Sequence, residues 1–369
     1  MDAPFEYVFP AIRGLQAGRE YYVSMCPLRL LPKIFLFNEE ELVPELRAQR
    51  QLNRGRLPEI ARYIVENKDS YVFSAITASV DADIRFAAAE NLGEQGLVGL
   101  LHIPMNARFI INDGQHRRAA IESALRDAPE LANESIAVVL FHDKGLERCQ
   151  QMFADLNRYA VRPARSLSVL YDHRDDQAQL AKLVISRLPS FRGLVEMERS
   201  TLSARSRRLF TLSAIYTATA TLLTGLPEGD PDSRAGYAAA FWSAVADQFP
   251  EWAAVRDGSL TSGEVRETFI HTHGVVLHAL GRVGNGLLPG TKARTGDDWT
   301  DRLGGLRQID WRRTNPAWEG RTTIGGRVSK SFQNVILTGN AIKLRLGLPL
   351  GSEEQRLEDA HARGADAAA

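Results

Sequence analysis

The segment INDGQHRRAA at residues 111–120 decides the fold of the N-terminal part of this chain, because it predicts a junction between a strand and a helix. The apolar stretch at 107–112 predicts a short buried strand, and AAIESALRDA after the motif predicts a helix. Asn112 and Gln115 have the spacing of a helix N-cap and its N3 partner, so the helix is expected to begin at the motif.

The first turn of such a helix predicts an anion-binding site. Its free N–H groups and the positive end of its dipole face whatever lies over the turn. Gly114 allows a ligand to approach the backbone closely, and Arg117 and Arg118 add fixed positive charge. Arg117 shares a helical face with Ile121 and is directed over the domain edge, whereas Arg118 lies nearer the flank that carries Glu122. We therefore predict that Arg117 contacts phosphate.

Two interpretations remain open for the other polar residues of the motif. Asp113 and His116 can hold a metal ion or move a proton, or Asp113 can be a simple cap and His116 a hydrogen-bonded helix residue. The predicted site for phosphate, a nucleotide or DNA comprises Asn112, Asp113, Gly114, Gln115, His116, Arg117 and Arg118.

The pattern around the motif predicts two domains and a tail. Further strands are expected at 19–26, 71–80, 97–103 and 135–142, and helices at 57–67 and 146–157. Residues 1–165 thus read as a small α/β (α+β) domain. From residue 166 the apolar residues recur at intervals of three and four, so 166–350 should be a mainly α-helical domain. Residues 351–369 have little to bury and are expected to be a disordered tail.

Composition indicates a globular protein, with 44% apolar and 24% charged residues and no net charge. Cys26 and Cys149 form no CxxC motif, which predicts neither a disulfide framework nor a zinc knuckle and fits a reducing cytoplasm. The start lacks a signal peptide, and no apolar run is long enough for a membrane span. We expect a cytoplasmic protein with no membrane partner.

Because the net charge is zero, DNA binding would have to come from local clusters of arginine. Three stretches are candidates: Arg47, Arg50, Arg54, Arg56 and Arg62; Arg199, Arg205, Arg207 and Arg208; and Arg307, Arg312, Arg313, Arg321, Arg327 and Lys330, with Trp311 and Trp318 among them. The third suggests a flexible basic loop that lies on a DNA backbone or stacks on a base. The predicted DNA contacts are Arg54, Arg56, Arg205, Arg207, Arg208, Arg312, Arg313, Arg327 and Lys330. The alternative is that these cations are solvated or paired with the equally numerous acids.

Four sequence blocks carry a family resemblance. NDGQHR resembles the signature of the DGQHR-domain family, and FPAIRGLQAGREYYVSMCPL, QMFADLNRYAVRPARSL and WRRTNPAWEGR with GGRVSKSFQN resemble its DNA-sulfur-modification branch, the DndB-like proteins. The resemblance implies a bacterial DNA-binding repressor of a gene cluster that places phosphorothioate sulfur in DNA. Its implied partners are double-stranded DNA at the promoter of its own cluster and the sulfur-modification proteins. It also implies a ParB- and sulfiredoxin-like domain, in which a comparable strand-turn-helix binds a nucleotide phosphate.

Cys26 and a group of histidines are further candidates. Arg29 and Lys33 follow Cys26 and would lower the pKa of its thiol if they surround it. In a family tied to sulfur chemistry, Cys26 is then a candidate persulfide acceptor or redox sensor, although a lone cysteine is commonly a small buried apolar residue. The HTHxxxxH pattern at 271–278 predicts no metal site, because its middle histidine lies off the shared face and no carboxylate or cysteine completes a ligand set.

Two functions therefore remain. The first is a DNA-binding repressor in which both domains form a basic groove, expected to be a homo-oligomer because repressors often read paired half-sites. The second is a nucleotide-binding phosphohydrolase or DNA-nicking enzyme, with Asp113, His116 and Arg117 as its active centre and ATP or CTP with magnesium as its cofactor. Asp113 lacks a second carboxylate in the motif to share a metal ion. The resemblance favours the repressor.

Overall fold

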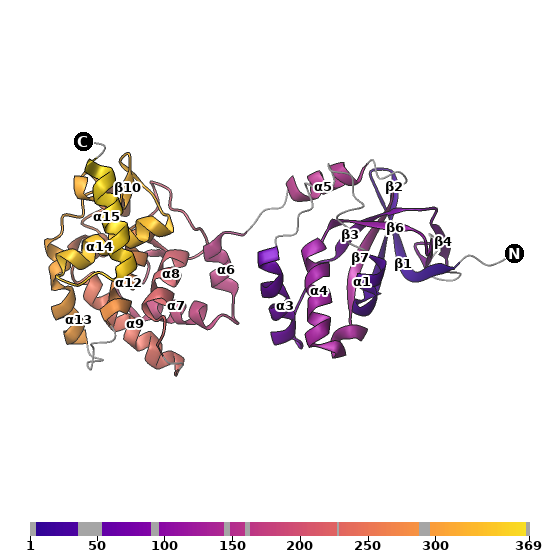
Figure 1. Ribbon diagram of the computed structural model, residues 1–369, viewed down its shortest axis with the longest axis horizontal. Coiled ribbons are helices and arrows are strands. Elements are labelled where there is room, and N and C mark those ends of the chain that lie inside the picture. The colour runs from indigo at the N-terminus through magenta and orange to yellow at the C-terminus, as the bar shows by residue number, and fades with distance from the viewer. Residues whose placement is uncertain are drawn as a thin grey trace. The chain divides into compact units, whose positions relative to one another are not determined.

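The computed structural model of the protein describes residues 5–35, 54–89, 96–143, 148–158, 163–226, 229–287 and 296–366 (Figure 1). Arg47 and Arg50 of the first arginine cluster lie outside these ranges. The chain divides into two compact units, Met1–Val161 and Arg162–Ala369. The sequence placed its domain boundary nearby, at residue 165.

The first unit contains a seven-stranded mixed sheet in the order β4-β5-β1-β2-β7-β3-β6. The strands are β1 (Glu6–Gln16), β2 (Arg19–Pro27), β3 (Ile76–Asp81), β4 (Arg85–Ala88), β5 (Val98–Pro104), β6 (Arg108–Asp113) and β7 (Ser135–His142). β3 and β7 pair in parallel, and the other neighbours are antiparallel. The helices are α1 (Leu31–Ile34), α3 (Leu57–Glu66), α4 (Gln115–Asp127) and α5 (Cys149–Arg158). The expected mixed α/β class is confirmed.

Strand β1 was not predicted, because Gly14 and Gly18 suggested turns before the strand at 19–26. Phe9 and Ala11 nevertheless alternate with exposed neighbours, as a strand with one buried face requires. Gly14 is needed inside the strand because the Tyr21 ring passes over it: a Cβ there would lie 2.5 Å from Tyr21 Cζ. The predicted strand at 71–80 begins only at Ile76.

One face of the sheet carries the core of this unit. Ile64 of α3 and Ile121 of α4 pack with Ala78 and Leu140 of the central strands, and all four side chains are almost completely buried. Figure 1 shows α3 and α4 side by side, which matches their contacts. Burial of this apolar face fixes which end of β6 meets the start of α4.

The second unit is a bundle of helices with two small two-stranded sheets. The helices are α6 (Arg165–Tyr171), α7 (Asp176–Arg187), α8 (Leu212–Leu222), α9 (Pro231–Ala246), α10 (Pro250–Arg256), α11 (Ser262–Thr268), α12 (Gly274–Leu287), α13 (Gly296–Leu303), α14 (Phe332–Arg345) and α15 (Ser352–Asp366). β8 (Val195–Glu196) pairs with β9 (Phe210–Thr211), and β10 (Thr323–Ile324) pairs with β11 (Arg327–Val328). None of the helices in the described ranges is long and apolar enough to cross a bilayer.

Helices α8 and α12 form the centre of the second unit. A Cβ at Gly274 would lie 3.3 Å from Ala214 Cβ, and a Cβ at Gly281 would lie 2.3 Å from the Ala218 carbonyl oxygen. The residue numbers increase together along this contact, so the two helices run parallel and begin at the same end. Glycine at 281 is what lets the two backbones come this close.

The prediction of a disordered tail is wrong for Ser352–Asp366, which form helix α15. Arg321 donates to both carboxylate oxygens of Glu358, and Lys343 Nζ lies 2.7 Å from Glu354 Oε2. These four side chains are each 13–15% exposed. The tail was misread because charged pairs, rather than apolar residues, dock this helix on α14 and the preceding loop.

Candidate functional site

The DGQHR motif lies at the edge of the sheet, where β6 ends and α4 begins. Gly114 is the N-cap of α4, with φ 106° in the left-handed region, and no side chain caps the helix. The predicted capping by Asn112 is therefore wrong. Asn112 is completely buried in β6, and its amide donates to Ser79 Oγ at 2.8 Å and lies 3.0 Å from Met152 Sδ. Register in the sheet turns this side chain inward, away from the turn.

Glycine is required at position 114 for two reasons. The positive φ is costly for any residue with a side chain. A Cβ there would also lie 3.0 Å from Ile76 Cγ1 and 3.1 Å from Arg117 Nη2. The motif glycine thus allows the close approach of Arg117 to the turn.

Arg117 is held in place by two neighbours. Its Nη2 lies 2.6 Å from Asp113 Oδ2, one helical turn away, and its Nη1 donates to Ser74 Oγ. The Arg117 side chain is 17% exposed and the Asp113 side chain is 50% exposed. Arg117 Nε is buried and makes no hydrogen bond to another residue that the structure describes. An incoming phosphate would meet a preorganised guanidinium whose charge Asp113 already offsets in part.

Arg56, at the end of the short 3-10 segment before α3, belongs to the same site. Burial lowers the pKa of His116, the charge of nearby Arg56 lowers it further, and Asp113 opposes both effects. His116 is therefore neutral at pH 7 and can accept as well as donate a hydrogen bond. The structure brings Arg56, His116 and Asp113 together from two helix starts. The side chain of Arg54 lies outside the described residues.

Arg118 is not available to an external anion, contrary to the prediction. It is 8% exposed, and it donates to the carbonyl oxygens of Phe35 at 3.0 Å and Pro32 at 3.2 Å as well as to Glu122. Arg118 therefore ties α4 to the segment around α1, and its role is to hold the fold.

The reactive interpretation of Cys26 is also contradicted. Its side chain is completely buried in the sheet, and burial raises the pKa of the thiol to about 12. Neither Arg29 nor Lys33 lowers it, because alternation along β2 points Cys26 into the core. Cys149 is equally buried, with its Sγ 3.7 Å from Asp143 Oδ2.

The three histidines of the HTHxxxxH pattern are structural. His271 is 1% exposed, stacks on the rings of Phe249 and Phe269, and accepts a hydrogen bond from Trp252 Nε1 at 3.0 Å. Burial lowers the pKa of His273 and of His278 to about 4. Within the described ranges, no three metal-ligating side chains of these types gather in one place.

Arg266 of α11 shapes the arginine-rich loop of the second unit. Its guanidinium is 9% exposed and donates to the carbonyl oxygens of Ser203 at 2.7 Å, Ala204 at 3.1 Å and Ser206 at 3.2 Å, and also to that of Arg208. This one side chain therefore fixes the backbone of residues 203–208, a role that sequence analysis missed. The sequence EVRETF carries no local signal for this role, because arginine is usually exposed and its burial here depends on the loop at 203–208.

The predicted DNA contacts divide into exposed and occupied side chains. Arg205, Arg207, Arg312, Arg327 and Lys330 are exposed. Arg208 is half-buried and donates to the carbonyl oxygen of Gly193.

Arg313 is half-buried too, and its Nη2 donates to the Arg266 carbonyl oxygen at 2.8 Å. The predicted base-stacking loop is wrong, because Trp311 and Trp318 are 5% and 2% exposed and stack on each other in the core. Among the predicted DNA contacts that the structure describes, the exposed side chains can therefore meet a partner without rearrangement.

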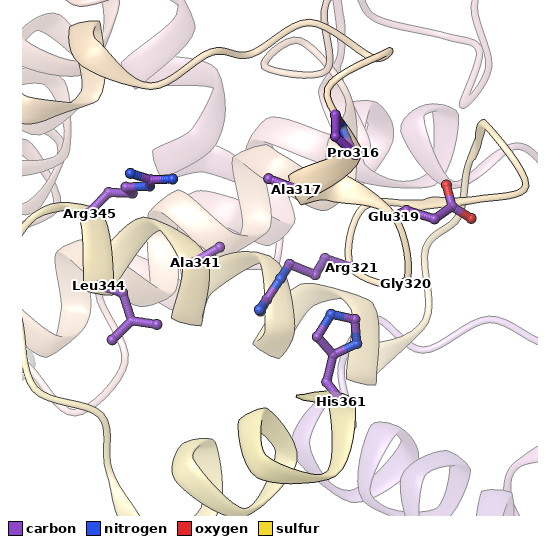
Figure 2. A pocket seen from close by; sticks show the side chains of 9 residues that line it. All are labelled: Pro316, Ala317, Glu319, Gly320, Arg321, Ala341, Leu344, Arg345 and His361. Atoms are coloured by element: carbon purple, nitrogen blue, oxygen red, sulfur yellow. The ribbon is translucent and has the colours of Figure 1, made fainter. Parts of the chain in front are cut away.

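Two cavities in the second unit were not foreseen. The first, of about 860 Å³, lies between the loop at 316–321, α14 and α15, and Figure 2 shows Arg345 and His361 on opposite sides of it. Two of its charged groups are used internally: Arg321 binds Glu358, and Glu319 accepts from the N–H groups of the 325–326 turn.

The second cavity, of about 550 Å³, lies where the loop at 200–204 meets the starts of α8 and α12. Lys330 lines it. The sequence analysis singled out this lysine as a predicted DNA contact.

Comparison with known proteins gives one match. The sequence model of the DndB family, described as DNA-sulfur modification-associated, matches residues 9–349. No curated protein and no solved structure matches the chain.

Proposed function

Because the chain belongs to the DndB family, whose members are associated with DNA sulfur modification, we propose that it is a DNA-binding regulator that represses a phosphorothioate-modification gene cluster. The family match over residues 9–349 is the observation that carries this proposal. In this proposal residues 1–165 form the DGQHR domain, of ParB- and sulfiredoxin-like type, and residues 166–350 form the helical domain.

The DGQHR junction supports the proposal by its chemistry. Free N–H groups at the start of α4, the glycine turn and the preorganised Arg117 suit a phosphate group. Arg56 adds a second cation at this edge. Arg117 would leave Asp113 in part and bind a phosphate oxygen, and neutral His116 would add one hydrogen bond.

Exposed arginines provide the remaining contacts of the proposed DNA surface. Arg205 and Arg207 project from the loop that Arg266 holds, while Arg312 lies on another loop and Arg327 in strand β11 of the same unit. Arginine contacts to phosphates supply affinity that does not depend on sequence. Double-stranded promoter DNA and the sulfur-modification proteins are the proposed partners, and the proposed assembly is a homo-oligomer that reads paired half-sites.

The test is a mobility-shift titration at physiological salt with DNA from the promoter of the protein's own gene cluster and with random DNA. Wild type is compared with Arg117→Ala and with the double variant Arg205→Ala/Arg207→Ala, in EDTA. Arg126→Ala is the matched control for Arg117, because it removes the same charge from the last turn of the same helix. Light scattering on the same samples gives the oligomeric state.

We expect promoter binding in EDTA that Arg117→Ala weakens about 10-fold or more and that Arg126→Ala leaves within about 2-fold. The double variant should weaken binding to both DNAs and reduce the salt dependence. Equal affinity for promoter and random DNA would contradict the repressor. Nicking or ATP or CTP hydrolysis that needs magnesium and Arg117 would instead make the motif an active centre with Asp113 and His116.

A further inference from the structure

The cavity of about 550 Å³ in the second unit is a place where positive charge gathers. Its walls include Thr211 and Ser213 at the start of α8, Thr272 and Gly274 at the start of α12, and Lys330. Its size is that of sites that bind small organic ligands. All of its walls belong to one compact unit, Arg162–Ala369.

Two helix dipoles point into this cavity with the same sign. α8 and α12 run parallel, and the first residue of α12, Gly274, packs against Ala214 in the first turn of α8. Each helix start carries partial positive charge on N–H groups that have no intrahelical acceptor. At the start of α8 the N–H groups of Ser213 and Ala214 already donate to Ser166 Oγ and Thr211 Oγ1, so the start of α12 is the one that can donate to a ligand. Side-by-side parallel helices concentrate this charge at one end of the pair, where a bound anion would relieve it.

Cationic side chains lie at this end of the helix pair. Acidic side chains there would balance the positive charge of the helix starts, but cationic ones add to it. The Lys330 ammonium lies 3.4 Å from the position of a Cβ on Gly274. The surrounding protein atoms lower the pKa of Lys330, and the charge of Arg165 lowers it further. No hydrogen bond or ion pair joins Lys330 to another described residue. Among the described residues that line the cavity, Glu267 is the one carboxylate, and it is exposed.

Polar groups inside the cavity lack partners. Thr272 is 4% exposed, lines the cavity, and its Oγ1 makes no hydrogen bond within the described structure. Arg313 also lines the cavity, and its Nε is buried without a partner. Buried hydroxyl and guanidinium groups are normally satisfied, so donors left open on one wall indicate an acceptor that occupies the space.

We propose that this cavity binds a phosphate group, held by Lys330, the Thr272 hydroxyl and the first N–H groups of α12. A phosphate supplies the acceptor oxygens that these donors lack. Its negative charge also complements the two helix starts and the side chains of Lys330 and Arg313. It can belong to a small phosphorylated molecule or to the end of a DNA strand. The inference does not depend on the repressor function, because it concerns a site separate from the DGQHR motif.

The experiment measures binding by isothermal titration calorimetry in chloride buffer free of sulfate and phosphate. The probes are inorganic phosphate, AMP, and a short single-stranded oligonucleotide with either a 5′-phosphate or a 5′-hydroxyl. The variants are Lys330→Gln and Thr272→Val, which keep side-chain size. Arg356→Gln, an exposed arginine on α15, is the matched control for loss of one charge in the same unit.

We expect Lys330→Gln and Thr272→Val each to weaken binding of the preferred probe about 10-fold or more, with Arg356→Gln within about 2-fold. Preference for phosphate or AMP identifies a small molecule, and preference for the 5′-phosphorylated strand identifies DNA. Lys330→Gln should also raise Tm without ligand, because it removes a cation that faces Arg165 and a helix start.

No binding of any probe to the wild type overturns the inference. So does binding that both cavity variants keep while they remain folded by circular dichroism. Loss of promoter binding in the mobility-shift assay bears on the proposed function alone, since that assay uses Arg117 and the loop arginines.

Discussion

Replacement of Arg266 by alanine tests whether one buried side chain holds the arginine-rich loop at 203–208. The change removes a guanidinium that donates to four backbone carbonyl groups of that loop. We expect the loop to lose its fixed shape, and with it the fixed placement of Arg205 and Arg207.

The magnitude follows from the contacts. Each hydrogen bond from a charged donor contributes about 1.5–3 kcal/mol, but the loop carbonyls lie among exposed residues and water replaces part of the loss. Removal of one member of a buried charged network usually costs about 3–5 kcal/mol, so we expect Arg266→Ala to lower the free energy of unfolding by about 3 kcal/mol. Arg266→Lys keeps the charge but cannot reach four acceptors, and should cost about 2 kcal/mol.

Urea unfolding, with hydrogen exchange of the 203–208 amides in the native state, measures both effects. Arg207→Ala is the control, because an exposed arginine with no such partners should change the unfolding free energy by less than about 0.5 kcal/mol. A loss below about 1 kcal/mol for Arg266→Ala, with unchanged exchange in the loop, would refute the reasoning.

Three other changes test the fold around the sites. Gly114→Ala should lower the free energy of unfolding by about 1–3 kcal/mol, because its Cβ would lie against Ile76 and the positive φ is unfavourable for alanine. Urea unfolding measures this loss, and an unchanged stability would contradict the need for glycine at this position. Burial tends to raise the pKa of Glu358, but the hydrogen bonds and charge of Arg321, together with the hydrogen bond from Asn340, outweigh this and lower the pKa. The stabilising contribution of Glu358 is therefore complete above its ordinary pKa near 4.5 and is lost as the pH falls below that value. Relative to the intrinsic rate at each pH, hydrogen exchange of the α15 amides should accelerate in that window. Glu358→Gln should remove this dependence on pH. Equal pH profiles of exchange for the wild type and the variant would count against the ion pair. Cys26 should resist alkylation by iodoacetamide at pH 8 until urea unfolds the protein, because burial raises the pKa of its thiol to about 12; native-state labelling at the rate of a free thiol would show that it is accessible.

Local patterns in the sequence were enough to predict the strand-turn-helix at the DGQHR motif. An apolar run before Asn112 and a helical pattern after Gly114 lie within a few residues of each other, and both appear as β6 and α4. The prediction that Asn112 caps the helix was wrong. Spacing makes Asn112 a good N-cap, but the register of β6 against β3 turns its side chain into the core.

Residues whose role depends on distant segments could not be read from the chain. Arg117 and Arg118 are adjacent in sequence, yet one faces the turn and the other is buried against Pro32 and Phe35. Trp318 likewise lies in a basic, glycine-rich stretch but packs in the core. A cluster of cationic residues in the sequence therefore did not indicate which of their side chains are exposed in the structure.

The sequence by itself determined the mixed α/β character of the first unit, the helical texture of the second and the glycine turn before α4, because each rests on periodicity or backbone preference within about a dozen residues. Only the tertiary structure decided that α8 and α12 run parallel and start together, that Arg266 holds the loop at 203–208, and that Lys330 has no acidic partner among the described residues. Those features depend on which segments pack together, and burial and charge at a site are set by neighbours that lie far apart along the chain.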